Sequence, residues 1–242
     1  MTGVATSLVH EVLAALSTVL DPELDEPITD LGFVRSVGID DAGVTVRLRL
    51  PTSFCSPNFA YLMASDAQDA LRRIDGLGRV VVQLDDHHDS DKINAGLAAD
   101  AGYVGTFGVE AETSLDELRA IFRRKAHTAA MERSAAALLR DTDLQVDELH
   151  RITLADLPDG PSKEALVRRR IAIGLGVEPG DPVVVDEYGG ALEPAAVPLR
   201  LRFAKAVRIS IEGNSHFCRG LLATRYADTG TSTRITNLRS TA

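Results

Sequence analysis

The feature that most constrains the fold is a change of hydrophobic period on either side of residues 51–59. Over residues 44–50 the apolar residues alternate, as in a β-strand with one buried face. Over residues 57–74 they recur at helical spacing. The stretch between them, Pro-Thr-Ser-Phe-Cys-Ser-Pro-Asn-Phe, must therefore connect a strand to a helix.

Cys55 lies just before the predicted helix. Ser56 suits the N-cap, and Pro57 suits the first turn, where a missing N–H costs nothing. Unpaired N–H groups and the positive end of the helix dipole favour a thiolate there, the form that attacks electrophiles or binds soft metals. The alternative is a buried structural cysteine, since free cysteines are among the most often buried residues. Cys55 is therefore a candidate functional thiol.

The spacing of the apolar residues also predicts a compact α+β domain over residues 1–100. We expect a small three-stranded sheet with helices packed on one face. The predicted elements are a helix at 7–20, strands at 33–39, 44–50 and 79–84, and the helix at 57–74.

The remainder of the chain predicts a mainly helical C-terminal region. Residues 101–113 have the composition of a linker, and residues 114–227 are predicted to form a helical region. Residues 228–242 are rich in Thr, Ser and Gly and are predicted to be a disordered tail. Within the helical region we expect helices near 115–140, 147–157, 162–175 and 197–226. In the last of these, a break at Gly213-Asn214 is the alternative to one continuous helix.

Composition limits the classes of partner. The net charge of -9 argues against nucleic acid, because binding to phosphates needs a basic surface. No apolar run is long enough to span a bilayer, which argues against a membrane partner. Two cysteines and no start typical of a targeting segment predict a cytoplasmic protein.

A second group of candidate ligands follows the third predicted strand, in the sequence Asp-Asp-His-His-Asp-Ser-Asp from residue 85. Imidazoles and carboxylates suit zinc, iron or manganese, which makes His87, His88 and Asp89 candidate metal ligands. The alternative is a polar loop that ends with Ser90 as the N-cap of a helix.

Cys218 lies on the apolar stripe of the last predicted helix, a face that must be buried. If the second half of the chain covers the first, Cys55 and Cys218 would meet near the His87-His88-Asp89 loop. Two thiols with imidazole and carboxylate would make a site for iron or zinc. The competing interpretation is that Cys218 packs as a small apolar residue.

Three sequence blocks carry a family resemblance. Asp21-Pro22-Glu23-Leu24, Leu31-Gly32-Phe33-Val34 and Thr52–Cys55 resemble the metal–sulfur cluster assembly domain of PaaD-like and SufT-like proteins. The resemblance covers about residues 7–84 and implies an α+β fold and a role in maturing iron–sulfur or related metalloproteins. Asp21, Glu23, Thr52 and Cys55 are the matching positions. The chain departs from the family in having Cys-Ser-Pro for Cys-Pro, and Pro51 for threonine.

A looser resemblance extends into the second half. His87–Asn94, Lys125-Ala126 and Phe217–Leu222 are similar to longer assembly-domain proteins, which have accessory roles beside soluble di-iron hydrocarbon monooxygenases. This resemblance implies a monooxygenase component as the client.

These observations predict an accessory protein rather than an enzyme. It would assist the assembly or insertion of a metal or iron–sulfur cluster in a client metalloenzyme, and a di-iron monooxygenase is the implied client. Iron or an iron–sulfur cluster would bind transiently, with zinc as the alternative. The expected partners are the client or cluster-assembly proteins, and the sequence leaves a homodimer open.

Two other functions compete with this prediction. The first is a metal-independent assembly adaptor or chaperone for an oxygenase component, with both cysteines structural. The second is a hydrolase or transferase that uses Cys55 with His87 or His88. It ranks last, because the chain has neither a nucleophile elbow nor a recognisable triad spacing.

Overall fold

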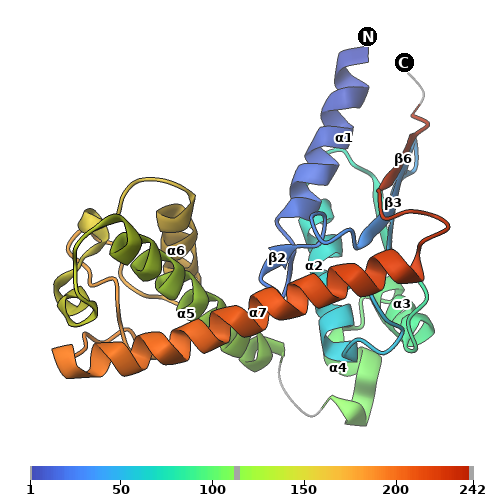
Figure 1. The fold of residues 1–242 in the computed structure, drawn as a ribbon. Coiled ribbons are helices and arrows are strands. Elements are labelled where there is room, and N and C mark those ends of the chain that lie inside the picture. The colour runs from blue at the N-terminus through green and yellow to red at the C-terminus, as the bar shows by residue number, and fades with distance from the viewer. Residues whose placement is uncertain (1, 112–114, 240–242) are drawn as a thin grey trace. The chain divides into compact units, whose positions relative to one another are not determined.

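The computed structural model describes residues 2–111 and 115–239, which fold into two compact units (Figure 1). Unit 1 comprises Met1–Leu115 and Asn214–Ala242, and unit 2 comprises Asp116–Gly213. The sequence predicts domains that follow one another along the chain. In the structure, unit 1 instead combines segments from the two ends of the chain. Each predicted C-terminal region includes residues outside the described ranges. These are 112 and 113 of the linker, 114 of the helical region and 240–242 of the tail.

Unit 1 is built on a four-stranded sheet with the order β5-β4-β3-β6. Its strands are β3 (Val34–Asp40), β4 (Gly43–Leu48), β5 (Arg79–Leu84) and β6 (Arg234–Asn237). The β3–β4 pair is antiparallel, and the β4–β5 and β3–β6 pairs are parallel. The three predicted strands are confirmed within one sheet.

The fourth strand, β6, corrects the predicted count of three. Arg234–Asn237 falls in the segment predicted to be a disordered tail, yet it pairs with β3, from Ser36↔Arg234 to Ile39↔Asn237. Its backbone N–H and C=O groups find partners only on a strand far away in sequence. The local Thr/Ser/Gly composition therefore gives no sign of the pairing.

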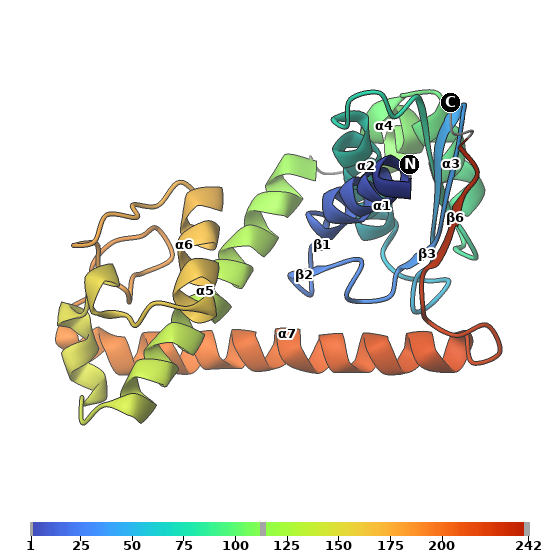
Figure 2. The same cartoon turned by 90° about the horizontal axis from the view of Figure 1, so that it is seen from above.

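Helices cover one side of this sheet, which confirms the predicted α+β class. Figure 2 shows α1 (Thr2–Ser17) and α2 (Pro57–Arg72) on one side of β3 and β6. The buried core joins apolar residues of these helices, such as Leu16 and Leu71, to strand residues such as Val46.

Close contact between β4 and β5 depends on a glycine. Gly43 has a φ of +151°, and a Cβ there would lie 2.0 Å from the carbonyl oxygen of Arg79. Any side chain at position 43 would therefore push the two parallel strands apart.

Short elements fill the connections of unit 1. They are a two-stranded pair, β1 (Leu20–Asp21) with β2 (Glu26–Pro27), helices α3 (Ser90–Ala98) and α4 (Gly102–Phe107), and the 3-10 turn η1 (Gly108–Glu110). Part of the predicted linker is thus helical, because the Tyr103 and Phe107 rings pack against Tyr61.

Unit 2 is mainly helical, as predicted. It contains α5 (Leu115–Asp141), α6 (Pro161–Ala172), the 3-10 helices η2 (Val146–Arg151), η3 (Leu154–Asp156) and η4 (Pro194–Ala196), and the first part of α7 (Val197–Arg225). Met131, Leu166 and Val184 belong to its own buried core.

Two predicted helices differ in detail. The one expected at 147–157 consists of the short helices η2 and η3, and α7 continues through Gly213-Asn214 without a break. Among the helices of the described residues, none combines the length and apolar character needed to cross a membrane.

Candidate functional site

Cys55 lies in the loop of residues 49–56, between the end of β4 and the start of α2. The Thr52 hydroxyl lies 3.5 Å from the Cys55 sulfur and accepts a hydrogen bond of 3.2 Å from the Phe54 N–H. Ser56 occupies the N-cap position of α2 but makes no side-chain cap bond. Thr52 therefore fixes the turn that places the half-buried Cys55 ahead of the helix.

His87 holds this loop from the other side. Its Nδ1 accepts a hydrogen bond of 3.0 Å from the Asp89 N–H, so the ring proton belongs on Nε2. The Nε2–H then donates to the carbonyl oxygen of Cys55 at 2.8 Å. Both ring nitrogens are thus engaged, and the side chain is only 5% exposed. His87 thus braces the backbone at Cys55, and its role as a metal ligand stays a prediction.

The neighbouring candidates lie apart from this contact. The exposed His88 ring packs near Phe54, with ring centroids 5.9 Å apart, and the backbone N–H of His88 donates to the Ser53 carbonyl. Asp89 occupies the N-cap position of α3 and is half-buried. Within the described residues, no group of three or more His, Cys, Asp or Glu side chains is arranged to hold a metal ion.

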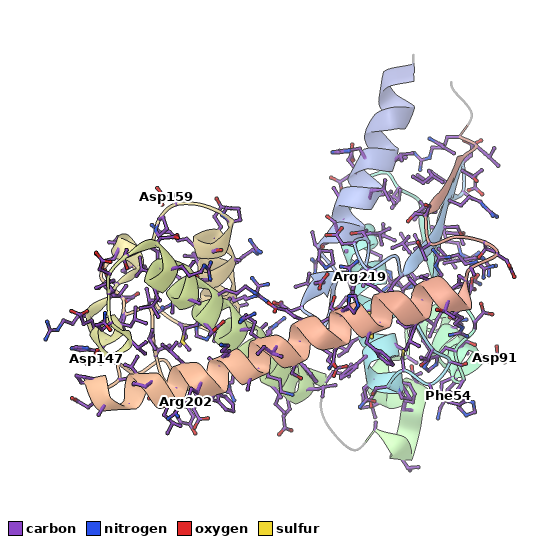
Figure 3. The ribbon with its side chains drawn as sticks, in the orientation of Figure 1. Phe54, Asp91, Asp147, Asp159, Arg202 and Arg219 are labelled. Carbon is purple, nitrogen blue, oxygen red and sulfur yellow. The ribbon has the colours of Figure 1, made fainter. Side chains whose placement is uncertain are left out.

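The C-terminal half of α7 packs against the acidic loop that contains Asp21 and Glu26. Asn214 donates to Glu23 at 3.2 Å, and the Ser215 hydroxyl donates to Glu26 at 2.5 Å. Arg219, which Figure 3 labels on α7, forms an ion pair with the same Glu26 carboxylate. These bonds fix the face of α7 that carries Cys218.

The end of α7 binds both loops that flank Cys55. The Arg225 guanidinium donates to the Leu50 carbonyl at 3.1 Å and to the Asp86 carbonyl at 2.5 Å. The Tyr226 hydroxyl donates to the Asp86 carboxylate at 3.2 Å. The helix therefore links the strand ends on both sides of the cysteine loop.

Cys218 lies on this docked face, half-buried against the core of unit 1. The pKa of its thiol is raised to about 11, chiefly by burial and to a smaller extent by the nearby Asp21, Cys55 and Glu23. The two cysteines are thus close enough to interact electrostatically, and Cys218 is a protonated thiol at neutral pH. Whether their sulfurs come within the distance of a shared ion stays a prediction.

Asp21 is the third group of this neighbourhood and is 7% exposed. Burial raises the pKa of its carboxyl to about 6, against the opposing effect of hydrogen bonds from the N–H groups of Leu24 and Glu23. Both bonds are 2.9 Å long. Asp21 therefore shapes its own loop and interacts electrostatically with Cys218 as a carboxyl with a pKa of about 6.

The structure thus divides the predicted candidates. It brings Cys55, Cys218 and Asp21 into one neighbourhood and gives His87 a bracing role, while His88 is exposed. Sequence reasoning missed the residues with which α7 docks, above all Ser215, Arg225 and Tyr226. The available signal was their spacing from Leu222, because Ser215 precedes it by seven residues and Arg225 and Tyr226 follow it by three and four, which places them on one face.

Residues 10–84 match the family described as iron-sulfur cluster assembly protein. An uncharacterized protein of Methanocaldococcus jannaschii is 35% identical over 86 residues, which are 35% of this chain and 88% of that protein. No solved structure matches. The chain therefore belongs, through its N-terminal third, to the iron–sulfur cluster assembly protein family.

Proposed function

We propose that the chain receives iron or an iron–sulfur cluster at Cys55 and assists its assembly or insertion in a client metalloenzyme. Family membership gives the chain a general role in iron–sulfur cluster assembly. The observation that supports the finer proposal is that a second thiol, Cys218, interacts electrostatically with both Cys55 and the buried carboxyl of Asp21. Thiolates are preferred ligands of iron–sulfur clusters and of zinc, which is the alternative cargo.

The protonation states suit uptake and release. Cys218 carries a proton at neutral pH, since its pKa is raised to about 11. Binding the cargo through this sulfur would release that proton, so affinity would fall as the pH falls. A carboxyl with a pKa of about 6, such as Asp21, is a suitable nearby acceptor at neutral pH.

The donor set suits a transient cargo better than a resident one. Cys55, Cys218 and Asp21 form no closed metal site within the described residues. A cargo held there would keep open positions, which the client's own ligands can occupy during transfer. We propose the oxygenase component of a di-iron monooxygenase as that client, because the second half of the chain resembles accessory proteins of such enzymes.

A second candidate function is the metal-independent adaptor, and one observation favours it. Phe54 is 81% exposed and Phe217 is 64% exposed, and each directly precedes one of the two cysteines. Exposed aromatic side chains are typical anchors of protein–protein interfaces. The adaptor would use these rings to bind the client and would need neither thiol.

Metal loading of cysteine variants tests the first function. Protein purified without oxygen and reconstituted with ferrous iron and sulfide should hold iron, and Cys55→Ser should lose most of it. Cys218→Ser should lose part of it. The control is His216→Ala, an exposed position on α7 that should leave the iron content unchanged. Full iron content in Cys55→Ser would contradict the proposal.

Client activation distinguishes the two functions. In a co-expression assay of oxygenase activity, the metal proposal expects Cys55→Ser to abolish activation. The adaptor expects both cysteine variants to remain active and Phe54→Ser with Phe217→Ser to fail. Because the rings flank the thiols, the phenylalanine variants must also be checked for iron content.

Alkylation kinetics provide an independent check of the thiols. With iodoacetamide at pH 7, Cys218 should react about tenfold more slowly than an unperturbed thiol, since little thiolate is present and its higher nucleophilicity compensates only in part. Cys55 should react faster than Cys218. Peptide mass spectrometry resolves the two sites, and equal rates would contradict this assignment.

A further inference from the structure

The other side of the unit 1 sheet carries a cationic cavity of about 590 Å³. Four arginines line it, namely Arg35, Arg47, Arg49 and Arg234, together with one carboxylate, Asp85. The net formal charge of these side chains is +3, in a chain whose net charge is -9. The cavity is therefore positively charged in a protein whose net charge is negative.

Strand register explains how the arginines gather. Ser36 on β3 pairs with Arg47 on β4 and with Arg234 on β6, so the three side chains lie in one row on the same face. The next residue of β3 on this face is Gly38, which pairs with Thr45 and Thr236. A Cβ at Gly38 would meet only the Thr45 carbonyl oxygen, at 3.8 Å. Small residues on the central strand thus leave a trough between two arginine-bearing strands.

The positive charge of the trough is incompletely balanced. Asp85 accepts hydrogen bonds of 2.9 Å from both Arg35 and Arg47, and the Asp86 carboxylate lies 3.6 Å from Arg35, so two carboxylates offset part of the charge of four arginines. Arg49 is 1% exposed, and its Nη2 has no hydrogen-bond partner among the described residues. Burial lowers the pKa of Arg49, and the adjacent Arg35 lowers it further against the opposing effect of Tyr226. A buried guanidinium with an unused donor is a costly arrangement that an anion would relieve.

We infer that this trough binds a small polyanion that carries two or more phosphate or carboxylate groups. The planar forks of arginine match both oxyanions with paired hydrogen bonds. The hydroxyls of Ser36, Ser232 and Thr236 line the same cavity and can donate to the remaining oxygens. A volume of about 590 Å³ falls in the range of small-molecule sites.

Titration calorimetry at low ionic strength tests the inference. The probes are pyrophosphate and tricarballylate, which separate phosphate from carboxylate recognition, with acetate at equal ionic strength as the reference. At least one polyanion should bind at a single site, and far more tightly than acetate does. No binding of either above the acetate level would overturn the inference.

Arginine variants locate the binding. Arg234→Gln should weaken it at least tenfold, and Arg234→Lys by less, because lysine keeps the charge but loses the fork. The matched control is Arg79→Gln on β5, an exposed arginine that does not line the trough and should leave affinity unchanged. Equal weakening in both Gln variants would mean nonspecific attraction and would overturn the assignment.

Two further measurements cover other outcomes. If Arg234→Gln disturbs β6, seen as a lower melting temperature, Arg47→Gln replaces it and should show the same loss. A ten-residue poly-glutamate peptide that binds where both small polyanions fail would assign the trough to a protein partner and overturn the small-ligand inference. Because no thiol takes part, these results are independent of metal loading at Cys55.

Discussion

Unit 1 buries the carboxyl of Asp21, unit 2 buries the imidazole of His127, and burial moves the two pKa values in opposite directions. Asp21 is 7% exposed and its pKa rises to about 6, while His127 is 2% exposed and its pKa falls to about 4. In both, burial disfavours the charged form, and for His127 the charges of Arg170 and Arg200 add to the effect.

The neighbours of each group make the difference in function. Asp21 lies near a thiol, Cys218, whose pKa it helps to raise. His127 lies near arginines that are committed to backbone carbonyls, such as Arg170 with Gly176 and Pro182. Burial of a titratable group therefore does not by itself identify a site. The reactive side chains beside the buried group are what identify a functional site.

The largest expected effect concerns the buried Arg170 of unit 2. Its guanidinium donates at 2.7 Å to the carbonyls of Gly176 and Pro182. Arg170→Met should destabilise unit 2 by about 4 kcal/mol, because two charged hydrogen bonds are lost and two buried carbonyls are left unpaired. Hydrogen exchange by mass spectrometry, which reports on each unit separately, should show faster exchange in unit 2.

The control for this comparison is Arg168→Met, an exposed position on the same helix. It should change stability by less than about 0.5 kcal/mol. Equal effects of the two substitutions would show that the buried bonds of Arg170 do not hold unit 2 together.

The second effect is acid destabilisation of unit 2. The native pKa of His127, about 4, lies below the ordinary 6.5, so between these values the unfolded state binds more protons. The stability of unit 2 should therefore fall as pH falls from 6.5 to 4, by about 3 kcal/mol in total. Urea unfolding over this range, with a unit 2 probe, measures the slope.

His127→Gln should remove this slope, because glutamine does not titrate. The matched control, His150→Gln, lies in η2 and should retain it. An NMR titration that gives His127 a pKa near 6.5 would contradict the assignment directly.

The third and smallest effect has the opposite sign and belongs to unit 1. The native pKa of Asp21, about 6, lies above the ordinary 3.8, so the native state binds more protons between these values. The contribution of the Asp21 carboxyl to the stability of unit 1 is fully present below pH 3.8 and decreases as the pH rises to 6. Asp21→Asn should stabilise unit 1 at pH 7 by about 2 kcal/mol, after weaker amide hydrogen bonds offset part of the gain.

Urea unfolding of unit 1 at pH 4 and pH 7 checks this prediction. The exposed Asp91 on α3 gives the control, since Asp91→Asn should leave the pH dependence as it is. If Asp21→Asn instead destabilises unit 1 at pH 7, the carboxylate is stabilised by its neighbours and not penalised by burial.

Much of unit 1 was predictable because its signals are local. The alternating residues of β4 and the helical spacing of α2 identify the strand, the loop and the helix around Cys55, since each pattern depends only on neighbours in the chain. The Asp-Pro-Glu-Leu block and the Thr52–Cys55 element were sufficient to indicate the family that the comparisons then confirmed.

The site and the trough were decided by contacts between residues far apart in sequence. The role of His87 depends on a hydrogen bond to Cys55, and the environment of Cys218 depends on burial beside Asp21. The arginine trough depends on the pairing of β6 with β3, whose partners lie at opposite ends of the chain. The sequence by itself determined the local periods, caps and family motifs. Only the tertiary structure decided which polar groups are desolvated together, because hydrogen bonding and pKa depend on three-dimensional surroundings that no local pattern encodes.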